Sequence, residues 1–347
     1  MAKERSAYLD VLKAITIILV VFGHSIQYGS GIDYLVGGYC LYDPVFSFIY
    51  SFHMPLFMLI SGYLFSHSSR GKTLKELIIS RIKQIVFPLF SWSFISLLVY
   101  VIKIAVGAST QKISIVWIFQ TILASFWGGP WFLWAIFWSS LFVMIGRSIF
   151  KDSPIFYLLV SLVGLVIPDY GNSAVHKFML PFFFIAYLFG TLDLENKLKA
   201  IYTHKAFALS SVILFVLLLP GFGFDTFIYT TGYSLIGKNA LYQLHSDSFR
   251  FVIGLVGSIA VMCVVHAFMD IIPRVIKRAL TYVGTATLGI YLVSNYLFDE
   301  ALKYLPIDGL NYWRAILEAC VVLIISLLLN FVIRRFRITN VLFLGAR

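Results

Sequence analysis

The first long apolar stretch of the chain is YLDVLKAITIILVVFGHSIQY, residues 8–28. It is long enough to cross the hydrocarbon core of a bilayer as an α-helix, which takes roughly 20 apolar residues. Three ionisable residues, Asp10, Lys13 and His24, interrupt this stretch. Because an ionisable side chain inside a membrane is costly, these residues predict that the helix carries a function.

Nine more apolar stretches follow, separated by short polar segments. They are residues 44–66, 85–107, 131–150, 153–168, 176–193, 206–221, 248–270, 280–298 and 312–334. This pattern predicts an all-α, polytopic bundle of about ten transmembrane helices. Residues 113–127 are apolar but short, and we interpret them as an interfacial or re-entrant helix, or alternatively as one further span. Since no linker rich in Pro, Gly or Ser divides the chain, we expect one transmembrane domain over residues 1–347 and no separate soluble domain.

The composition excludes a soluble enzyme. Hydrophobic residues make up 60% of the 347 residues and charged residues 12%, whereas soluble domains carry about 25% charged residues. The net charge of +11 comes mostly from basic residues between the apolar stretches, where they set membrane orientation rather than bind nucleic acid. Nineteen lysines and arginines fall in segments on the same side of the membrane as the N-terminus, and only six fall in segments on the opposite side. These six are Lys112, Lys177, Lys238, Arg250, Lys303 and Arg314. We therefore expect both termini in the cytoplasm, membrane lipids as neighbours, and no nucleic-acid partner.

Known sequence signatures of metal and nucleotide sites are absent from the chain. Its three cysteines, Cys40, Cys263 and Cys320, lie far apart without paired spacing. The sequence contains no HExxH motif, no P-loop and no dinucleotide glycine fingerprint. We therefore predict neither a metal cofactor nor a disulfide framework.

The three ionisable residues of the first stretch share one face of the predicted helix. Each residue advances by about 100°, so the step from Lys13 to His24 returns to within about 20° of the same direction, about 16 Å further along the axis. Asp10 lies three residues before Lys13, within reach of an ion pair. We predict that these side chains face an interior channel, where a neutral His24 imidazole can act as a general base. The alternative is an ion pair at the membrane edge and a histidine that only packs.

The second apolar stretch contains SFHMPLFMLISGYLFSHS, residues 51–68. Pro55 can loosen its helix, and Ser61 with Gly62 offers a small surface against which another helix can pack closely. His53 is a further intramembrane imidazole. It is either a substrate ligand or a packed, hydrogen-bonded histidine.

Basic and aromatic residues at the two membrane faces are further candidates. Arg81 and Lys83, at the predicted cytoplasmic start of the third span, either hold the phosphates of a cofactor or contact anionic lipid heads. Trp131 and Trp134 begin the fourth span at its predicted outer end, and Tyr39 lies in the first external loop. These aromatic residues either stack on a sugar ring or belong to an interfacial aromatic belt.

These segments together resemble acyltransferase family 3, a family of integral membrane acyltransferases, and in particular its fucose 4-O-acetylase-like branch. The first stretch resembles the family's first helix, in which a basic residue precedes a histidine, here Lys13 and His24. The other matching segments are SFHMPLFMLISGYLF, a basic segment ending in Arg81 and Pro88, PWFLW at residues 130–134, and YVGTATLGIYLVSN at residues 282–295. The resemblance covers essentially the whole chain.

Two positions depart from the pattern of this family. Many members have arginine where this chain has Lys13, so a bidentate contact would become a point-charge contact. The late motif often ends in a histidine where this chain has Val293 and Ser294. A role that the family assigns to that second histidine cannot be assigned to a residue of this chain. His24 is therefore the stronger candidate for the essential imidazole.

The resemblance implies transfer of an acyl group, usually from cytoplasmic acetyl-CoA, to a hydroxyl of a glycan or lipid-linked sugar at the outer side of the bacterial inner membrane. We expect His24 to accept the hydroxyl proton or to receive the acyl group itself, with Lys13, held by Asp10, orienting the donor. Arg81 and Lys83 would hold the donor phosphates. The residues expected to bind the substrate are His53, Ser61, Trp131, Trp134 and Tyr39.

Two other classes of function share parts of this pattern. A transporter or flippase of a glycolipid or small polar substrate also has about ten spans, intramembrane charges and helix breakers. A carrier would move its substrate without consuming acetyl-CoA, and repeated halves are not visible in the sequence. A membrane scaffold or sensor would leave the stripe of Asp10, Lys13 and His24 without a role.

Overall fold

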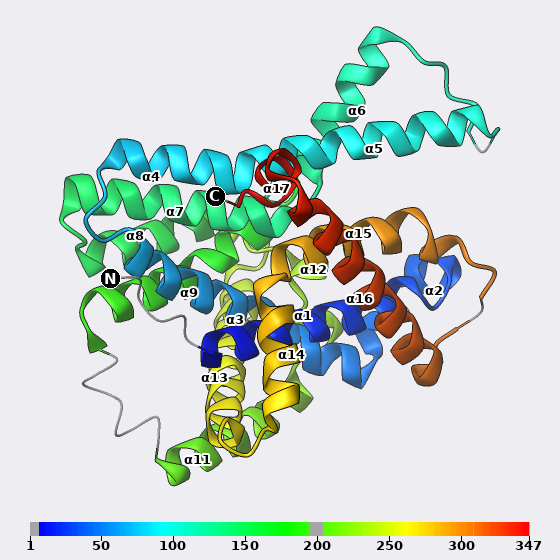
Figure 1. The fold of residues 1–347 in the computed structure, drawn as a ribbon. Coiled ribbons are helices and arrows are strands. Elements are labelled where there is room, and N and C mark those ends of the chain that lie inside the picture. Colours follow the sequence, from blue (N-terminus) through cyan, green and yellow to red (C-terminus); the bar gives the residue numbers. More distant parts are fainter. Residues whose placement is uncertain (1–6, 108, 195–203, 308, 347) are drawn as a thin grey trace.

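The computed structural model describes residues 7–107, 109–194, 204–307 and 309–346, and every regular element in these ranges is helical. Within these ranges, seven helices or helix pairs are long and apolar enough to cross a membrane. They are α1 (Ala7–Tyr28), α3 (Pro44–Ser68), α4 with α5 (Leu74–Ala105), α7 (Trp131–Phe150), α9 (Ser173–Thr191), α13 (Ala240–Phe268) and α16 (Tyr312–Arg335). The predicted all-α, polytopic bundle is thus confirmed (Figure 1).

Three shorter apolar helices accompany these spans. They are α6 (Ile115–Gly128), α8 (Pro154–Val166) and α11 (Lys205–Leu218). The short helix expected at residues 113–127 is α6, which forms a hairpin with α5 at the edge of the bundle (Figure 1). Since α8 has 13 residues and α11 has 14, neither meets the length of a straight span, and the number of ten spans stays a prediction.

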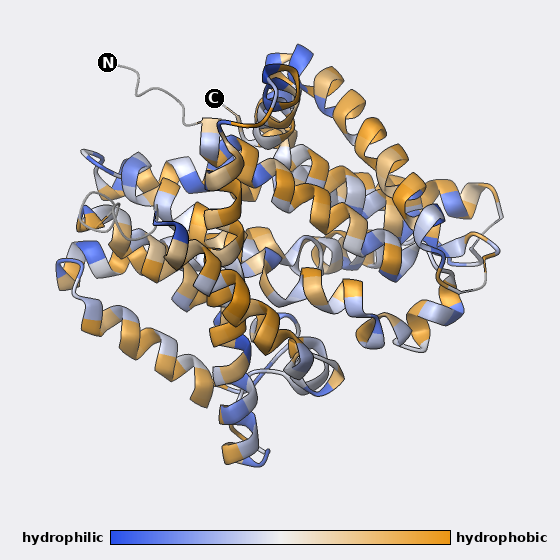
Figure 2. Ribbon diagram, turned by 90° about the horizontal axis from the view of Figure 1, so that it is seen from below, coloured by the Kyte–Doolittle hydropathy of each residue, from blue (hydrophilic) through white to orange (hydrophobic). Residues whose placement is uncertain are grey.

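The outside of the bundle is suited to lipid. Apolar residues dominate the helices (Figure 2), and many large apolar side chains are exposed, among them Leu98 of α5, Leu158 of α8 and Leu317 of α16. In a soluble protein such a surface would drive aggregation, whereas in a bilayer it faces hydrocarbon.

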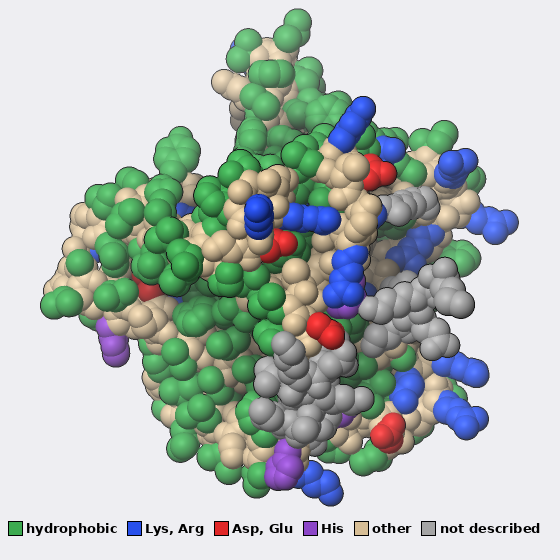
Figure 3. Space-filling view, turned by 90° about the vertical axis from the view of Figure 1, so that its left-hand side faces the viewer, with side chains coloured by type: hydrophobic (Ala, Val, Ile, Leu, Met, Phe, Trp, Pro, Cys, Tyr) green, Lys and Arg blue, Asp and Glu red, His purple; other side chains and the backbone are tan. Residues whose placement is uncertain are grey.

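The two ends of the bundle differ in charge. We call the end where α1 begins and α3 ends the basic side, and the end where α1 ends and α3 begins the loop side. Figure 3 shows lysines and arginines gathered on the basic side, and exposed members include Arg70, Lys75, Lys151, Arg274 and Arg278. The segments α2 (Ile32–Val36) and α12 (Ile228–Thr231) belong to loops that follow α1 and α11.

The α1 helix lies at the centre of the bundle. It packs against α3, α16, α14 (Arg274–Thr285) and α15 (Thr287–Glu300), and its residues Leu12, Ala14, Ile17 and Val21 are fully buried. A helix with polar residues on one face and partners on several sides can hold those residues inside the protein, away from lipid. The fold therefore places the stripe of α1 in the interior.

The predicted single helix over residues 280–298 is wrong, because the structure has two helices, α14 and α15, that meet at Ala286. Asn330 of α16 donates its Nδ2 hydrogen bond to the carbonyl of Ala286 over 3.2 Å, and Arg334 donates to the carbonyl of Thr285 over 2.5 Å. A break within a membrane is tolerated where a neighbouring side chain satisfies a freed carbonyl, here that of Thr285. The Ala286 carbonyl also accepts from the Ile290 N–H group over 3.0 Å. Gly284 lets α14 approach α1 closely, because a Cβ there would lie 1.9 Å from the Asp10 carbonyl oxygen of α1.

The close helix packing predicted at Ser61 and Gly62 is confirmed at Gly62, which lies between α3 and α9. A Cβ on Gly62 would lie 2.2 Å from the carbonyl oxygen of Phe183. No side-chain adjustment relieves this contact, because the obstacle is backbone. The absence of a side chain at Gly62 therefore allows α3 and α9 to pack closely.

Replacing Gly62 with alanine is expected to lower stability by about 1–3 kcal/mol, since α3 and α9 must move apart to admit one methyl group. Thermal unfolding of the purified protein in nanodiscs would measure the loss. Gly128→Ala is the matched control, because a Cβ at Gly128 meets nothing within 4 Å. Equal melting temperatures for Gly62→Ala and the wild type would contradict the packing role.

Candidate active site

A large cavity lies between α1, α3, α5, α6, α7 and α15, and it contains both intramembrane histidines predicted from the sequence. Its volume is about 670 Å³. His24 of α1 and His53 of α3 line it, together with Trp131 at the start of α7. We call it the histidine cavity.

A second cavity of about 250 Å³ adjoins the first toward the basic side. Lys13 of α1 and Ser61 of α3 line it, and we call it the lysine cavity. Val20, Met54 and Tyr291 line both cavities and therefore form the boundary between them. The two ends of the predicted stripe thus lie in adjoining spaces, and Val20 stands between them on α1.

The predicted pairing of Asp10 with Lys13 is confirmed. The Lys13 Nζ atom lies 2.7 Å from the Asp10 Oδ1 atom, and the Asp10 side chain is 3% exposed. Helical spacing explains this contact, because residues three apart lie on neighbouring turns of one face. A buried carboxylate needs such a partner, and Lys13 is in turn held at the wall of its cavity.

The two imidazoles of the histidine cavity are held differently. His53 is 2% exposed, and its Nδ1 atom lies 2.7 Å from the carbonyl oxygen of Ile49, to which it donates. This hydrogen bond leaves Nε2 of the neutral ring as an acceptor. The His24 ring stands edge-on to the rings of Tyr28 and Phe298, with centroids 5.7 and 5.8 Å away. Its Nδ1 atom is buried without a hydrogen-bond partner in the described part of the chain.

The remaining predicted site residues lie outside both cavities. Arg81 places its guanidinium over the Phe65 ring, 4.5 Å from the centroid, and its Nε is buried without a partner among the residues described. Lys83 is exposed. Trp134 is buried, donates its Nε1 hydrogen bond to the carbonyl of Phe126 over 2.8 Å, and therefore belongs to a packed aromatic cluster. Tyr39 is 59% exposed at the start of the short 3-10 helix Tyr39–Tyr42, which follows α2.

Several lining residues of the histidine cavity were missed by the sequence reasoning. They are Tyr50, Asn172, Tyr229, Asn295, Asp299 and Glu300. One signal was available for α15, where Tyr291, Asn295 and Asp299 are spaced four residues apart on one face. For Asn172 and Tyr229 the sequence offers no such spacing, because each comes from a loop.

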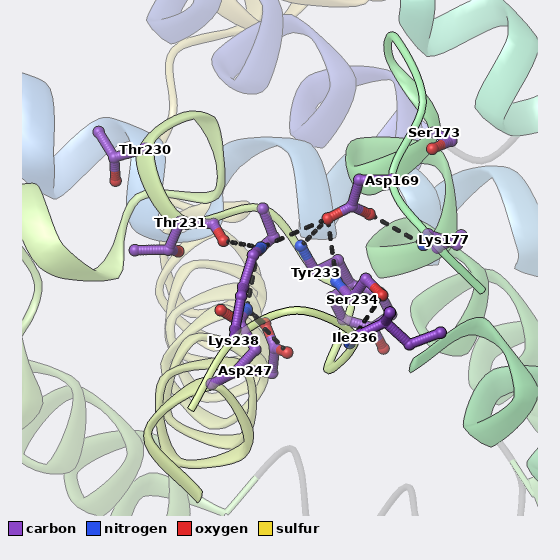
Figure 4. A network of polar contacts seen from close by, with 12 residues as sticks. Asp169, Ser173, Lys177, Thr230, Thr231, Tyr233, Ser234, Ile236, Lys238 and Asp247 are labelled. Carbon is purple, nitrogen blue, oxygen red and sulfur yellow. Dashed lines mark hydrogen bonds and ion pairs between the residues drawn. The ribbon is translucent and has the colours of Figure 1, made fainter. Parts of the chain in front are cut away.

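A polar network on the loop side holds the segment that carries Tyr229 (Figure 4). Asp169, which follows α8, accepts hydrogen bonds from the backbone N–H groups of Tyr233 and Ser234 over 2.8 and 3.0 Å. Its other oxygen lies 2.8 Å from the Lys177 Nζ atom. One carboxylate thereby ties the loop after α12 to the start of α9.

A buried arginine completes this network from α13. Arg250 is 2% exposed and donates to the Gly232 carbonyl over 2.7 Å and to the Thr231 hydroxyl over 2.6 Å, while Asp247 lies 3.2 Å away as its counter-ion. Gly232 has φ +68, which favours glycine. A small cavity of about 30 Å³ touches Arg250, Tyr229 and His53, so the network ends directly behind the histidine cavity.

Asp169→Asn is expected to lower the melting temperature at neutral pH. Burial works to raise the pKa of Asp169, but hydrogen bonds from Lys177 and the two backbone N–H groups outweigh it and lower the pKa to about 2. The ionised carboxylate therefore contributes stability above its ordinary pKa of about 3.9, and this contribution is lost as the pH falls through about 2. The melting temperatures of the two proteins should therefore converge as the pH falls from about 3.9 to about 2. Asp33→Asn, at an exposed carboxylate, is the control, and a neutral-pH melting temperature unchanged in Asp169→Asn would disprove the role.

Comparison with known proteins identifies the family. A family model described as an acyltransferase domain, that of acyltransferase family 3, matches residues 6–335. The chain belongs to acyltransferase family 3. Nodulation protein NolL of Mesorhizobium japonicum (strain LMG 29417 / CECT 9101 / MAFF 303099) is 27% identical over 313 residues, which cover 85% of this chain and 77% of that protein. Nodulation protein NolL of Sinorhizobium fredii (strain NBRC 101917 / NGR234) is 26% identical over 320 residues, covering 86% and 79%. No solved structure matches the chain.

Family membership decides among the three classes of function considered above. A member of acyltransferase family 3 with seven long apolar helices is a multi-pass membrane O-acyltransferase. The transporter and the scaffold are therefore set aside. The cavities described above belong to an enzyme that uses an acyl donor and a hydroxyl acceptor.

Proposed function

We propose that this enzyme transfers an acetyl group from acetyl-CoA, bound from the cytoplasm, to a hydroxyl of a glycan or lipid-linked sugar at the outer side of the bacterial inner membrane. The observation that carries the proposal is the pair of adjoining cavities, which puts Lys13 and His24 on one path through the bundle. In this arrangement the basic side is cytoplasmic, in agreement with the positive-inside rule.

The lysine cavity and the basic side supply the groups that an acyl-CoA needs. The lysine cavity is lined mainly by apolar side chains such as Ile17 and Phe57, and Lys13 is its only Lys or Arg among the residues that the structure describes. Such walls suit a pantetheine arm, and the basic side suits its phosphates. We assign the phosphates to Arg81 and Lys83, and the buried, unpaired Nε of Arg81 is a donor still available to an anion.

The chemistry assigned to His24 is proton transfer. His24 accepts the proton of the acceptor hydroxyl as this oxygen attacks the thioester carbonyl, the C–S bond breaks, and the imidazolium returns the proton to the departing thiolate. In the second route the imidazole itself takes the acetyl group and passes it to the hydroxyl. Both routes give an acetyl ester and free CoA. Lys13, held by Asp10, lies about 16 Å from His24 along α1 and therefore orients the donor arm rather than the reacting carbonyl.

His53 and Trp131 are assigned to the acceptor sugar. With its Nδ1 occupied by Ile49, His53 offers Nε2 to a sugar hydroxyl in the histidine cavity. The Trp131 ring, at the cavity wall, can stack on a sugar ring. Ser61 lies in the lysine cavity instead, so we assign it to the donor arm.

Thiol release from acetyl-CoA tests the proposed reaction. Purified protein in nanodiscs should release CoA in the presence of a pooled surface-glycan extract, and radiolabelled acetyl groups should appear on the glycan. Folded protein that releases no thiol and labels no glycan with any acceptor pool would overturn the proposal.

Val20→Phe tests whether the two cavities form one path. The larger ring would fill the boundary between Lys13 and His24, and transfer is expected to fall by at least about tenfold, while overpacking costs roughly 1–3 kcal/mol of stability. Val321→Phe is the matched control, since Val321 is 53% exposed on α16. Unchanged transfer in folded Val20→Phe would show that the acetyl group takes another route.

A further inference from the structure

We propose that the histidine cavity accepts uncharged sugars and rejects anionic ones, with Asp299 and Glu300 as the residues that determine this specificity. The inference rests on the proposed function, because it concerns the acceptor of the same reaction. It adds a class of substrate, neutral pyranosides or furanosides rather than uronic or sialic acids.

The charges that line the histidine cavity carry this inference. Asp299 and Glu300, in the last turn of α15, both line it. No Lys or Arg lines it within the described ranges, so the two carboxylates are its only permanent charges there. The lysine cavity differs, since it holds Lys13 and neither Asp nor Glu among its described residues. The lysine cavity is thus suited to an anionic or electron-rich ligand, and the histidine cavity to a ligand that carries no negative charge.

The counter-ions of the two carboxylates stand behind them, outside the cavity lining. Lys103 of α5 forms an ion pair with Glu300 and lies over the rings of Tyr100 and Tyr304. Lys303 lies 2.5 Å from the Asp299 Oδ1 atom. Each pair occupies one oxygen of its carboxylate. Their unshared oxygen lone pairs are left to accept hydrogen bonds from sugar hydroxyls.

A buried group of the same cavity independently points to a hydroxyl-bearing ligand. His53, 2% exposed, lines the cavity, and because Nδ1 donates to the Ile49 carbonyl, Nε2 of the neutral ring is a hydrogen-bond acceptor. An imidazole acceptor and two carboxylate acceptors together match a ligand that donates several hydrogen bonds. Asn295, Trp117 and Trp131 add an amide and two ring faces to the same walls. Vicinal hydroxyls on a sugar ring provide these donors, whereas a sugar carboxylate would meet like charge.

Competition between neutral and acidic acceptors tests the inference. A surface-glycan oligosaccharide pool is separated by anion exchange into a neutral and an acidic fraction, and each is offered with radiolabelled acetyl-CoA at equal hydroxyl concentration. Wild-type enzyme is expected to label the neutral fraction at least about tenfold more than the acidic one. In the double variant Asp299→Asn, Glu300→Gln this ratio should fall about tenfold, because Lys103 and Lys303 become unpaired and no longer face a carboxylate. The KM for the neutral fraction should also rise, because hydrogen bonds to charged groups are lost.

Two further variants separate charge from structure. The charge-retaining double variant Asp299→Glu, Glu300→Asp should keep the preference for the neutral fraction, and Asp225→Asn, at an exposed carboxylate outside the cavity, should match the wild type. Preferential labelling of the acidic fraction by the wild type, or an unchanged ratio in the folded neutralised variant, would overturn the inference and leave acetyl transfer intact. Labelling of neither fraction, without thiol release, would instead overturn the proposed function and the inference with it.

Discussion

Replacing His24 with alanine is expected to lower acetyl transfer by about 10²–10⁴-fold, the usual contribution of a positioned general base. His24 lines the histidine cavity on the same helix as Lys13, and its ring is held edge-on between Tyr28 and Phe298. The variant should still insert and fold, because the other walls of the cavity stay in place. Thiol release and labelled acetyl transfer, measured in the same nanodisc preparation, give the size of the loss.

His245→Ala is the matched control for this experiment. His245 is exposed in the first turns of α13, away from both cavities, and its removal should leave transfer unchanged. The pH dependence of transfer adds a second measurement, since a base must be deprotonated to act. Wild-type transfer by folded His24→Ala would exclude His24 from both proposed routes and move the search to His53.

The second large effect is expected at Lys13. Lys13→Met removes the charge from the lysine cavity and leaves the buried Asp10 carboxylate without its ion pair. Breaking a buried pair in this way costs about 3–5 kcal/mol, so the single variant should be both unstable and inactive. Inactivity of this variant alone would therefore say little about the chemistry.

The double variant Asp10→Asn, Lys13→Met separates the two roles. It replaces the ion pair with uncharged groups of similar size, and its melting temperature should approach that of the wild type. Transfer should still fall by about 10²-fold, because the cation that orients the donor arm is missing and the thioester is misplaced. Lys13→Arg keeps the charge and should retain most activity. A double variant that transfers at the wild-type rate would reduce Lys13 to a structural counter-ion.

Residues on one helix were the most predictable part of the candidate site. The pairing of Asp10 with Lys13 and the common face of Lys13 and His24 follow from the rotation of about 100° per residue. Gly62 was also predicted correctly as a position of close helix packing, because a residue without a side chain in an apolar helix can be seen in the sequence. Its partner, α9, could not be seen there. Arg81 shows the limit of this reasoning, since its position in the sequence did not indicate its contact with Phe65.

The break between α14 and α15 shows why periodicity alone can mislead. Residues 280–298 are apolar enough for one continuous helix, but the helix breaks where Arg334 of α16 donates to the Thr285 carbonyl and Asn330 donates to the Ala286 carbonyl, more than forty positions away. A sequence pattern cannot contain that contact, because it depends on how α16 packs. The same reason applies to Tyr229, which reaches the histidine cavity through the network of Asp169 and Arg250.

The membrane class, the helical fold, the family resemblance and the polar stripe of α1 could all be predicted from the sequence, because each depends on composition or on spacing along one helix. Three features became visible in the folded protein alone: the stripe opens into two adjoining cavities, Val20, Met54 and Tyr291 divide them, and Asp299 and Glu300 line one cavity while Lys103 and Lys303 do not. The physical reason is that a cavity and its charge are made by side chains from several helices. Their relative positions are set by packing across the bundle, which spacing along the chain does not record.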